Sequence, residues 1–195
     1  MKRIAATALA LALGTLVVSS SPQLLAQAGG GQWTTLLDGK NFNSFNPIGD
    51  ANWKVAEGAM QADMGTGFLV SKQSYGDFEI RAEFWVTADA NSGIFIRAEN
   101  PKEITAMNAY EVNIFDMRPD QAYRTGAIVD VAKPSVKVDT GNKWNTLEIT
   151  AKGPRMIVKV NGMQTVDAQD MKHARGPFAL QRSAGTVKFR KVEIR

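Results

Sequence analysis

The chain has 195 residues, of which 44% are hydrophobic and 22% charged, and its formal net charge is +4. This length is enough for one domain with its own hydrophobic core, and the small charge excess, without a basic cluster interleaved with aromatic residues, argues against a nucleic-acid partner. The chain has no cysteine, which excludes disulfide bonds and a lipoprotein anchor, so the folded part must be held together by its core alone.

The N-terminal segment has the pattern of a secretory signal peptide. Lys2 and Arg3 form a positively charged start, residues 4–18 are rich in Ala and Leu, and Ala26 and Ala28 place small residues at the two cleavage positions. The apolar run is shorter than the ~20 residues that a transmembrane helix needs. We therefore expect cleavage after Ala28, export to the periplasm or the extracellular space, and no membrane insertion after cleavage.

The chain divides accordingly into a signal peptide at residues 1–28, a Gly-rich spacer at residues 29–32 and one domain at residues 33–195. Within the domain, short runs alternate between polar and apolar residues, as strands with one face in a core do. Asn161 and Gly162 give the strongest hairpin signal, because both tolerate the positive φ of a tight turn. The pattern predicts an all-β fold, a sandwich of two antiparallel sheets. The predicted strands are 33–37, 53–56, 59–62, 67–71, 78–86, 93–99, 110–116, 125–131, 144–151, 156–160, 165–167, 178–182 and 187–194.

Three alternating runs between residues 75 and 116 form the centre of the predicted domain. In each run, one set of alternate residues is apolar and is expected to face the core. Arg97, Glu99, Glu111 and Asn113 would then share the outer face of neighbouring strands, and such a mixture of charged and amide groups beside aromatic rings suits a sugar-binding surface. The predicted core residues are Phe78, Ile80, Phe84, Ile94, Ile96, Val112, Ile114, Leu147, Ile149, Val158, Val160 and Leu180.

Several blocks of the sequence resemble one family. They are LDGK (37–40), YGDFE (75–79), NSGIFIR (91–97), YEVNIFD (110–116), TGAI (125–128), KWN (143–145), VNG (160–162), LQ (180–181) and FR (189–190). Their order and spacing resemble the 3-keto-disaccharide hydrolase family over about residues 33–195. The resemblance implies a jelly-roll sandwich similar to concanavalin A-like lectins and glucanases, with a concave sheet that receives a sugar. It also implies a candidate activity, the cleavage of a glycoside whose C3 hydroxyl has been oxidised to a ketone.

Glu111 is the first candidate for a catalytic group, because a carboxylate in the middle of a strand is unusual unless that face binds a ligand or faces solvent. Arg97 is predicted to point the same way and to orient a sugar oxygen or stabilise an oxyanion through its fixed fork of donors. The alternatives are a solvated Glu111 and a cross-strand salt bridge from Arg97 to Glu99 or Glu111.

The number of carboxylates on the central strand restricts the reaction. Retaining glucanases of concanavalin A-like fold carry acidic residues at alternate positions of one strand, but here these positions are Glu111, Asn113 and Phe115, so the usual pair of carboxylates is missing. In a 3-keto sugar one base is enough, because the C2 hydrogen lies α to a carbonyl and the C1 substituent can leave by elimination before water adds. Asp116 would join the site only if the strand bulges or ends there, and is otherwise a turn-forming residue.

Other polar and aromatic residues complete the predicted site. Asn113, Glu99, Gln181 and Trp85 are predicted to bind substrate, although Gln181 could instead satisfy a strand end and Trp85 could belong to the core. No metal or other cofactor is predicted. Zinc is usually bound by several histidine or cysteine side chains, and this chain has one histidine, His173, and no cysteine. A Ca²⁺-like ion held by carboxylates remains an alternative, with Glu99, Glu111, Asp116 and Asp130 as its candidate ligands.

The sequence therefore predicts an exported hydrolase that acts on glycosides, with 3-keto-glycosides or 3-keto-disaccharides as substrates and single-base elimination followed by hydration as the mechanism. The alternative from another class is a non-catalytic carbohydrate-binding module that uses the same concave sheet. Asn113 stands where the family usually has Gln, a departure that slightly favours the binding module. Both hypotheses predict that the protein binds a carbohydrate.

Overall fold

A computed structural model describes residues 31–195. The predicted signal peptide, its cleavage site and the first two residues of the spacer lie outside the described residues. Within the described part, no helix is long and apolar enough to cross a membrane.

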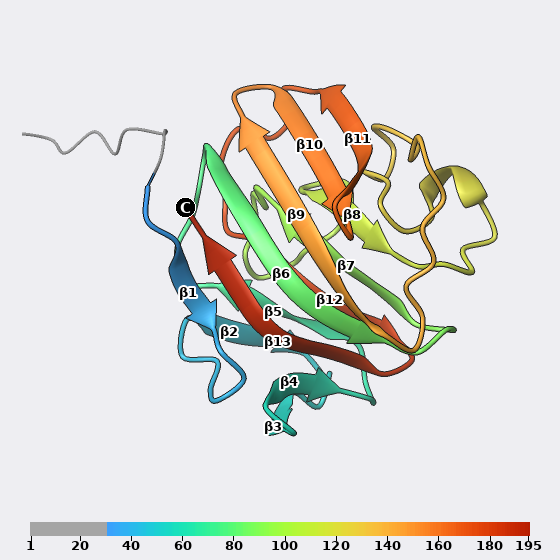
Figure 1. The fold of residues 1–195 in the computed structure, drawn as a ribbon. Coiled ribbons are helices and arrows are strands. Elements are labelled where there is room, and N and C mark those ends of the chain that lie inside the picture. The colour runs from blue at the N-terminus through green and yellow to red at the C-terminus, as the bar shows by residue number, and fades with distance from the viewer. Residues whose placement is uncertain (1–30) are drawn as a thin grey trace, which may run out of the picture.

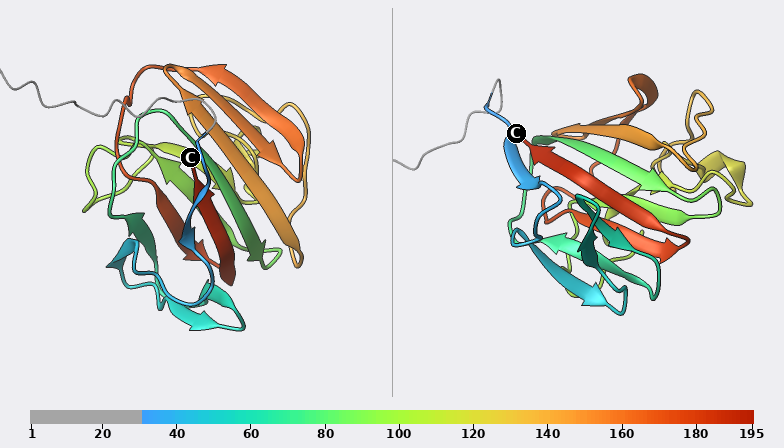
Figure 2. Two further views of the ribbon diagram at one scale, coloured as in Figure 1. Left: turned by 60° about the vertical axis from the view of Figure 1, so that its left-hand side comes forward. Right: turned by 60° about the horizontal axis from the view of Figure 1, so that its bottom comes forward.

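The domain is a sandwich of two antiparallel sheets packed face to face (Figure 1, Figure 2). The eight-stranded sheet, called the large sheet, has the order β11-β10-β9-β6-β13-β4-β3, with β1 paired to β13; the five-stranded small sheet has the order β2-β5-β12-β7-β8. The predicted two-sheet fold is confirmed. The strands are β1 (Thr34–Leu37), β2 (Phe45–Gly49), β3 (Lys54–Ala56), β4 (Ala59–Ala62), β5 (Gly67–Ser71), β6 (Phe78–Val86), β7 (Asn91–Ile96), β8 (Tyr110–Ile114), β9 (Trp144–Lys152), β10 (Arg155–Val160), β11 (Met163–Gln169), β12 (Ala179–Ala184) and β13 (Val187–Ile194), and the single 3-10 turn of the described chain is η1 (Gln121–Tyr123).

The core lies between the two sheets and is built from the alternating apolar positions. All the predicted core residues are buried, from Phe78 with 4% of its surface exposed to Ile94 and Val112 with none. Each large apolar side chain removed from water in this way contributes about 1.5–3 kcal/mol to folding. The turn at Asn161 and Gly162 joins β10 to β11 with φ values of 51° and 78°, as the hairpin prediction requires.

Three strand predictions differ from the structure. Strand β2, which contains Pro47, was not predicted. It is an edge strand, and edge strands are where a sheet tolerates proline, which has no N–H group to donate. Residues 125–131 do not form a strand: they bond to the edge of β8, but Gly126 and Asp130 have φ values of 86° and 60° and bend the segment. The strand predicted for residues 93–99 begins earlier, at Asn91, and ends earlier, at Ile96, as β7.

Candidate functional site

The outer face of the small sheet brings together three of the predicted site residues. Gly93 on β7 pairs with Asn113 on β8 and with Gln181 on β12, and the next residue on the same face, Phe95, pairs with Glu111. Because the intervening residues of these strands point into the core, Glu111, Asn113 and Gln181 point away from it and surround Gly93.

Gly93 has no side chain, so its neighbours on this face approach its backbone closely. A Cβ atom placed on Gly93 would lie 3.1 Å from the backbone oxygen of Val112, 3.5 Å from Cγ of Glu111 and 3.6 Å from Oε1 of Gln181. These two side chains therefore flank the space that a larger residue would fill. A glycine inside a strand often marks the place where a ligand approaches the backbone closely, and Gly93 was not among the residues predicted to form the site.

The amide groups beside Gly93 present hydrogen-bond acceptors. Nδ2 of Asn113 donates to the backbone oxygen of Tyr123, so Oδ1 of the same amide group points away from Tyr123. Oδ1 of Asn113 and Oε1 of Gln181 are buried and have no hydrogen-bond partner within residues 31–195. A buried acceptor without a donor lowers stability by ~1–3 kcal/mol. Such an atom in a native fold is therefore a candidate to accept a hydrogen bond from a bound ligand. Sugar hydroxyl groups are donors of the required kind.

Glu111 is buried, with 9% of its surface exposed. Burial raises the pKa of Glu111 to about 7; the positive charge of Arg118 opposes this rise in pKa and the negative charge of Asp130 adds to it. Within residues 31–195 the Glu111 carboxylate forms no hydrogen bond or ion pair that would favour its ionised form. A carboxyl group whose pKa is near neutrality is suited to accept a proton from a ligand that binds beside it.

Arg97 does not belong to this cluster, and its predicted place beside Glu111 is wrong. The backbone of Arg97 has a φ of 55°, which breaks the alternation just after β7 ends. Its side chain is 2% exposed and donates to the backbone oxygens of Gly76 and Gly153 at 3.0 and 2.8 Å. It also donates to Asp77 at 3.4 Å. Arg97 therefore ties the small sheet to the ends of β6 and β9.

Asp116 also has neighbours other than those expected. It follows the end of β8, and its carboxylate accepts hydrogen bonds from the N–H groups of Thr140 and Gly141 at 2.6 and 3.0 Å and from the hydroxyl of Thr125 at 2.5 Å. These bonds hold the loop between η1 and β9 against β8. The turn-forming alternative describes this environment better than a role in the chemistry.

Glu99 lies beyond the end of β7, where the chain has already turned. Its N–H group donates to the backbone oxygen of Asn108, and its carboxylate lies 2.9 Å from Nδ1 of His173. The Glu99 carboxylate is thus directed to the segment that precedes β12 and not to Glu111. The break at Arg97 that displaced the arginine also moved Glu99 off the predicted face.

Trp85 lies on the other sheet from Glu111, which corrects its predicted place in the site. It pairs with Trp144 and Lys188 on the outer face of the large sheet, and the Lys188 ammonium lies 5.3 Å from the centre of its ring. The period-2 pattern assigned Trp85 to an outer face correctly, but the pattern of one strand does not say which of two sheets that strand joins.

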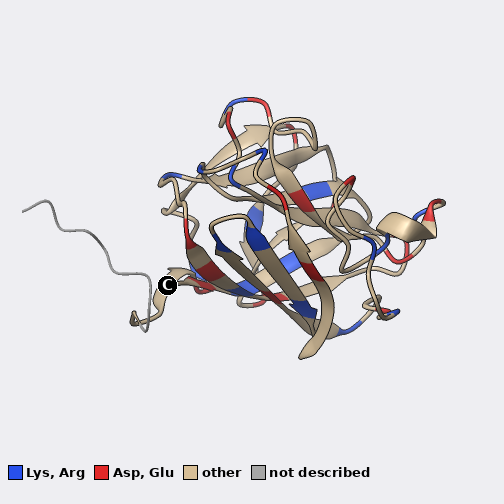
Figure 3. Ribbon diagram, turned by 90° about the horizontal axis from the view of Figure 1, so that it is seen from above, with Lys and Arg blue, Asp and Glu red and all other residues tan. Residues whose placement is uncertain are grey.

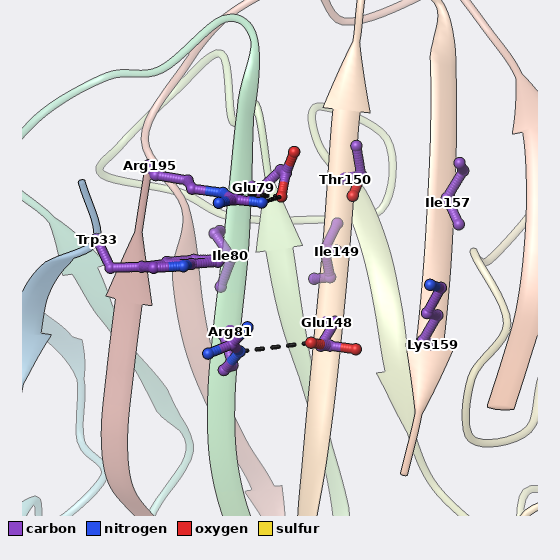
Figure 4. A pocket seen from close by; sticks show the side chains of 10 residues that line it. All are labelled: Trp33, Glu79, Ile80, Arg81, Glu148, Ile149, Thr150, Ile157, Lys159 and Arg195. Carbon is purple, nitrogen blue, oxygen red and sulfur yellow. Dashed lines mark hydrogen bonds and ion pairs between the residues drawn. The ribbon is translucent and has the colours of Figure 1, made fainter. Parts of the chain in front are cut away.

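A shallow pocket also lies on this outer face of the large sheet (Figure 4). The guanidinium groups of Arg81 and Arg195 each lie 4.6 Å from the centre of the Trp33 ring, and in Figure 4 the ring lies between them. Arg81 pairs with Glu148, and Arg195 pairs with Glu79. Figure 3 shows that charges of both signs occur along the strands. Trp33 therefore fixes the start of the domain to the sheet and has little ring surface left for a sugar.

Comparisons with known proteins agree with this architecture. Residues 32–195 match the sequence profile of the 3-keto-alpha-glucoside-1,2-lyase-like domain family. The chain belongs to this family. No curated protein is significantly similar to it in sequence.

The solved structures that share the fold include enzymes and binding proteins. A candidate glycosyl hydrolase from Parabacteroides distasonis ATCC 8503 has a TM-score of 0.76 at 19% identity, over 84% of this chain and 93% of that one. The carbohydrate-binding module CBM66 from Bacillus subtilis has a TM-score of 0.59 at 20% identity, over 82% and 92% of the two chains. The exoplasmic/lumenal domain of VIP36 with Ca²⁺ and mannose bound has a TM-score of 0.56 at 10% identity, over 78% and 82%. At these identities the likeness shows the jelly-roll fold that members of the family share with lectin-like proteins.

Proposed function

We propose that this member of the 3-keto-alpha-glucoside-1,2-lyase-like domain family cleaves 3-keto-glycosides, including 3-keto-disaccharides, on the outer face of its small sheet. The observation that carries the proposal is the buried carboxylate of Glu111, whose pKa is raised to about 7, beside two unsatisfied amide oxygens. The family membership supports the choice of substrate class. We propose that export through the predicted signal peptide places this activity outside the cytoplasm.

Glu111 is the general base of the proposed reaction. It takes the proton from C2 of the keto sugar, the electron pair forms an enolate with the C3 carbonyl, and collapse of the enolate breaks the bond between C1 and the leaving-group oxygen. The protonated Glu111 then returns a proton to that oxygen, and water adds across the C1–C2 double bond. A base with a pKa near the working pH suits both the acceptance and the return of a proton.

The enolate needs a positive group nearby, and Arg97 cannot supply it because its donors are occupied by backbone oxygens and Asp77. Arg118 is the positive charge that acts on Glu111, and we assign it to this role. It lies on the loop between β8 and η1, where no strand pattern could have placed it from the sequence. Oδ1 of Asn113 and Oε1 of Gln181 accept hydrogen bonds from the hydroxyl groups of the sugar.

The proposal is tested by incubating the purified protein with 3-keto-glucosides and following the loss of substrate by mass spectrometry as a function of pH. We expect turnover, with kcat/KM rising as the pH passes through about 7, because Glu111 is a base only when its carboxyl group, with a pKa of about 7, has lost its proton. If kcat/KM instead rises near pH 4, where an ordinary carboxyl group loses its proton, a base with a raised pKa does not take part in the mechanism. Binding of the sugar without turnover would establish the carbohydrate-binding module instead.

A further inference from the structure

We infer, on the basis of the proposed function, that the leaving group of the substrate lies along a strip formed by Phe68 and Ile48, and that the enzyme prefers 3-keto-glycosides with an aromatic aglycone. The strip begins at Gln181, directly beside Gly93. Neither Phe68 nor Ile48 was among the residues predicted to bind substrate.

The register of the small sheet defines the strip. Gly93 on β7 pairs with Gln181 on β12, Gln181 pairs with Phe68 on β5, and Phe68 pairs with Ile48 on β2. These residues form one row across four strands, and because paired residues point to the same side, all of them face outward. With strands ~4.8 Å apart, Phe68 lies about 10 Å from Gly93. A group attached to C1 of a sugar above Gly93 would reach it.

The neighbouring row on the Phe95 side is closed to a ligand. Phe95, Ala179 and Val70 belong to that row, and they are buried in a small cluster with Ile104 and Ala109 from the loop that joins β7 to β8. Phe68 and Ile48 pack against the edge of the same cluster and stay partly exposed.

On the other side of the site the path is closed by backbone. The segment after η1 bonds to the edge of β8: the N–H of Asn113 donates to the oxygen of Ala127, and the N–H of Val129 donates to the oxygen of Glu111. Ala127 and Val129 are themselves buried. A leaving group that extends across the strands from Gly93 therefore runs toward β12, β5 and β2, because the β8 edge is covered.

The chemistry of the strip selects an apolar occupant. Beyond Gln181 its side chains are a benzyl and a sec-butyl group, which offer no hydrogen bond to the hydroxyls of a second sugar. The Phe68 ring already packs edge-on against Phe95, with ring centres 5.2 Å apart, so it is held in place before any ligand arrives. An aromatic aglycone would gain both apolar burial and ring contact from this arrangement.

The test measures binding, so that it does not depend on turnover. Phenyl and methyl 3-keto-α-glucosides, chosen to match the family description, are titrated by calorimetry into the Glu111→Gln protein, which cannot consume them. We expect the phenyl glycoside to bind about tenfold more tightly, a ratio typical of filling an apolar subsite. Adding Phe68→Ala or Phe68→Leu should bring the ratio toward one and leave the methyl glycoside affinity unchanged. Ile157→Ala, a partly buried apolar residue on the outer face of the large sheet, is the control and should keep the full ratio.

The results separate this inference from the proposed function. Three results would contradict the proposed role of the strip. They are equal affinities for the two glycosides, a phenyl preference that persists in both Phe68 variants, and no binding of either glycoside. If wild-type protein turns over both glycosides at equal kcat/KM and the affinities are equal, the function stands and the strip fails. If the phenyl preference depends on Phe68 but wild-type protein shows no turnover, the strip stands as part of a binding site and the hydrolytic function fails.

Discussion

Replacing Glu111 by Gln is expected to reduce turnover of a 3-keto-glycoside by at least ~10²–10⁴-fold, the usual contribution of a general base. The amide keeps the shape of the side chain and one acceptor oxygen, but it cannot accept the C2 proton, so substrate affinity should change little. The measurements are kcat from the loss of substrate and Kd from calorimetry. A variant that keeps full activity on a confirmed substrate would remove Glu111 from the mechanism.

The same variant should gain stability at high pH. Burial raises the pKa of Glu111 from its ordinary value of 4.5 to about 7. Below pH 4.5 the carboxyl group is protonated in both the folded and the unfolded chain; as the pH rises through 7 the folded state loses the stability that the protonated group provided. The full loss corresponds to about 3 kcal/mol, because each pKa unit is worth about 1.4 kcal/mol. A Gln at this position does not ionise and so is not subject to the loss.

Urea unfolding of both proteins at pH 4.5 and pH 8 measures this effect. The free energy of unfolding of Glu111→Gln, relative to wild type, should be higher at pH 8 than at pH 4.5 by about 3 kcal/mol. Equal differences at the two pH values would show that Glu111 is not buried as described. A carboxylate that destabilises the fold where it is ionised, and is needed for activity there, is the trade-off expected of an active site.

Replacing Arg97 by Ala is expected to destabilise the protein by about 3 kcal/mol, because it leaves the carbonyl groups of Gly76 and Gly153 without their charged donor. Arg97→Lys should recover only part of this, since a single ammonium cannot replace the fork of donors. The midpoint of urea unfolding reports the loss, and Arg81→Ala, which removes a partly exposed arginine on the large sheet, is the matched control with a small effect.

Turnover distinguishes this structural role from a catalytic one. At a temperature where the Arg97 variants remain folded, their kcat per folded molecule should stay within a few-fold of wild type. If Arg97→Lys kept its stability but lost turnover, Arg97 would have to contact the substrate, in conflict with the hydrogen bonds that hold its side chain.

The comparison of Glu111 with Arg97 shows how far alternation along a strand can predict a site. Glu111, Asn113 and Gln181 lie within regular strands, so the period-2 pattern placed them on the correct face, and the same pattern predicted the core. Arg97 and Glu99 come after a residue with positive φ, and a single such residue reverses which face the following side chains take. No residue type marks this in advance, because an arginine seldom adopts that conformation.

Two other features depend on contacts between distant segments. Trp85 was placed on an outer face correctly, but the assignment of its strand to the large sheet follows from pairing with β9 and β13, which no local pattern specifies. Arg118 and Asp130, whose charges act on Glu111, lie on loops without periodicity. Their positions are set by the loops that pack along the edge of β8.

The most direct test of Glu111 as the base is the exchange of the C2 hydrogen with solvent. A 3-keto-glucoside is turned over in D₂O, and the deuterium at C2 of the released sugar is measured by NMR at times short enough to limit spontaneous exchange. Wild-type protein should introduce one deuterium at C2 for each glycoside cleaved, and Glu111→Gln should fall to the rate of the protein-free control. Cleavage that leaves the C2 hydrogen in place, or exchange that continues undiminished in Glu111→Gln, would contradict proton abstraction by Glu111.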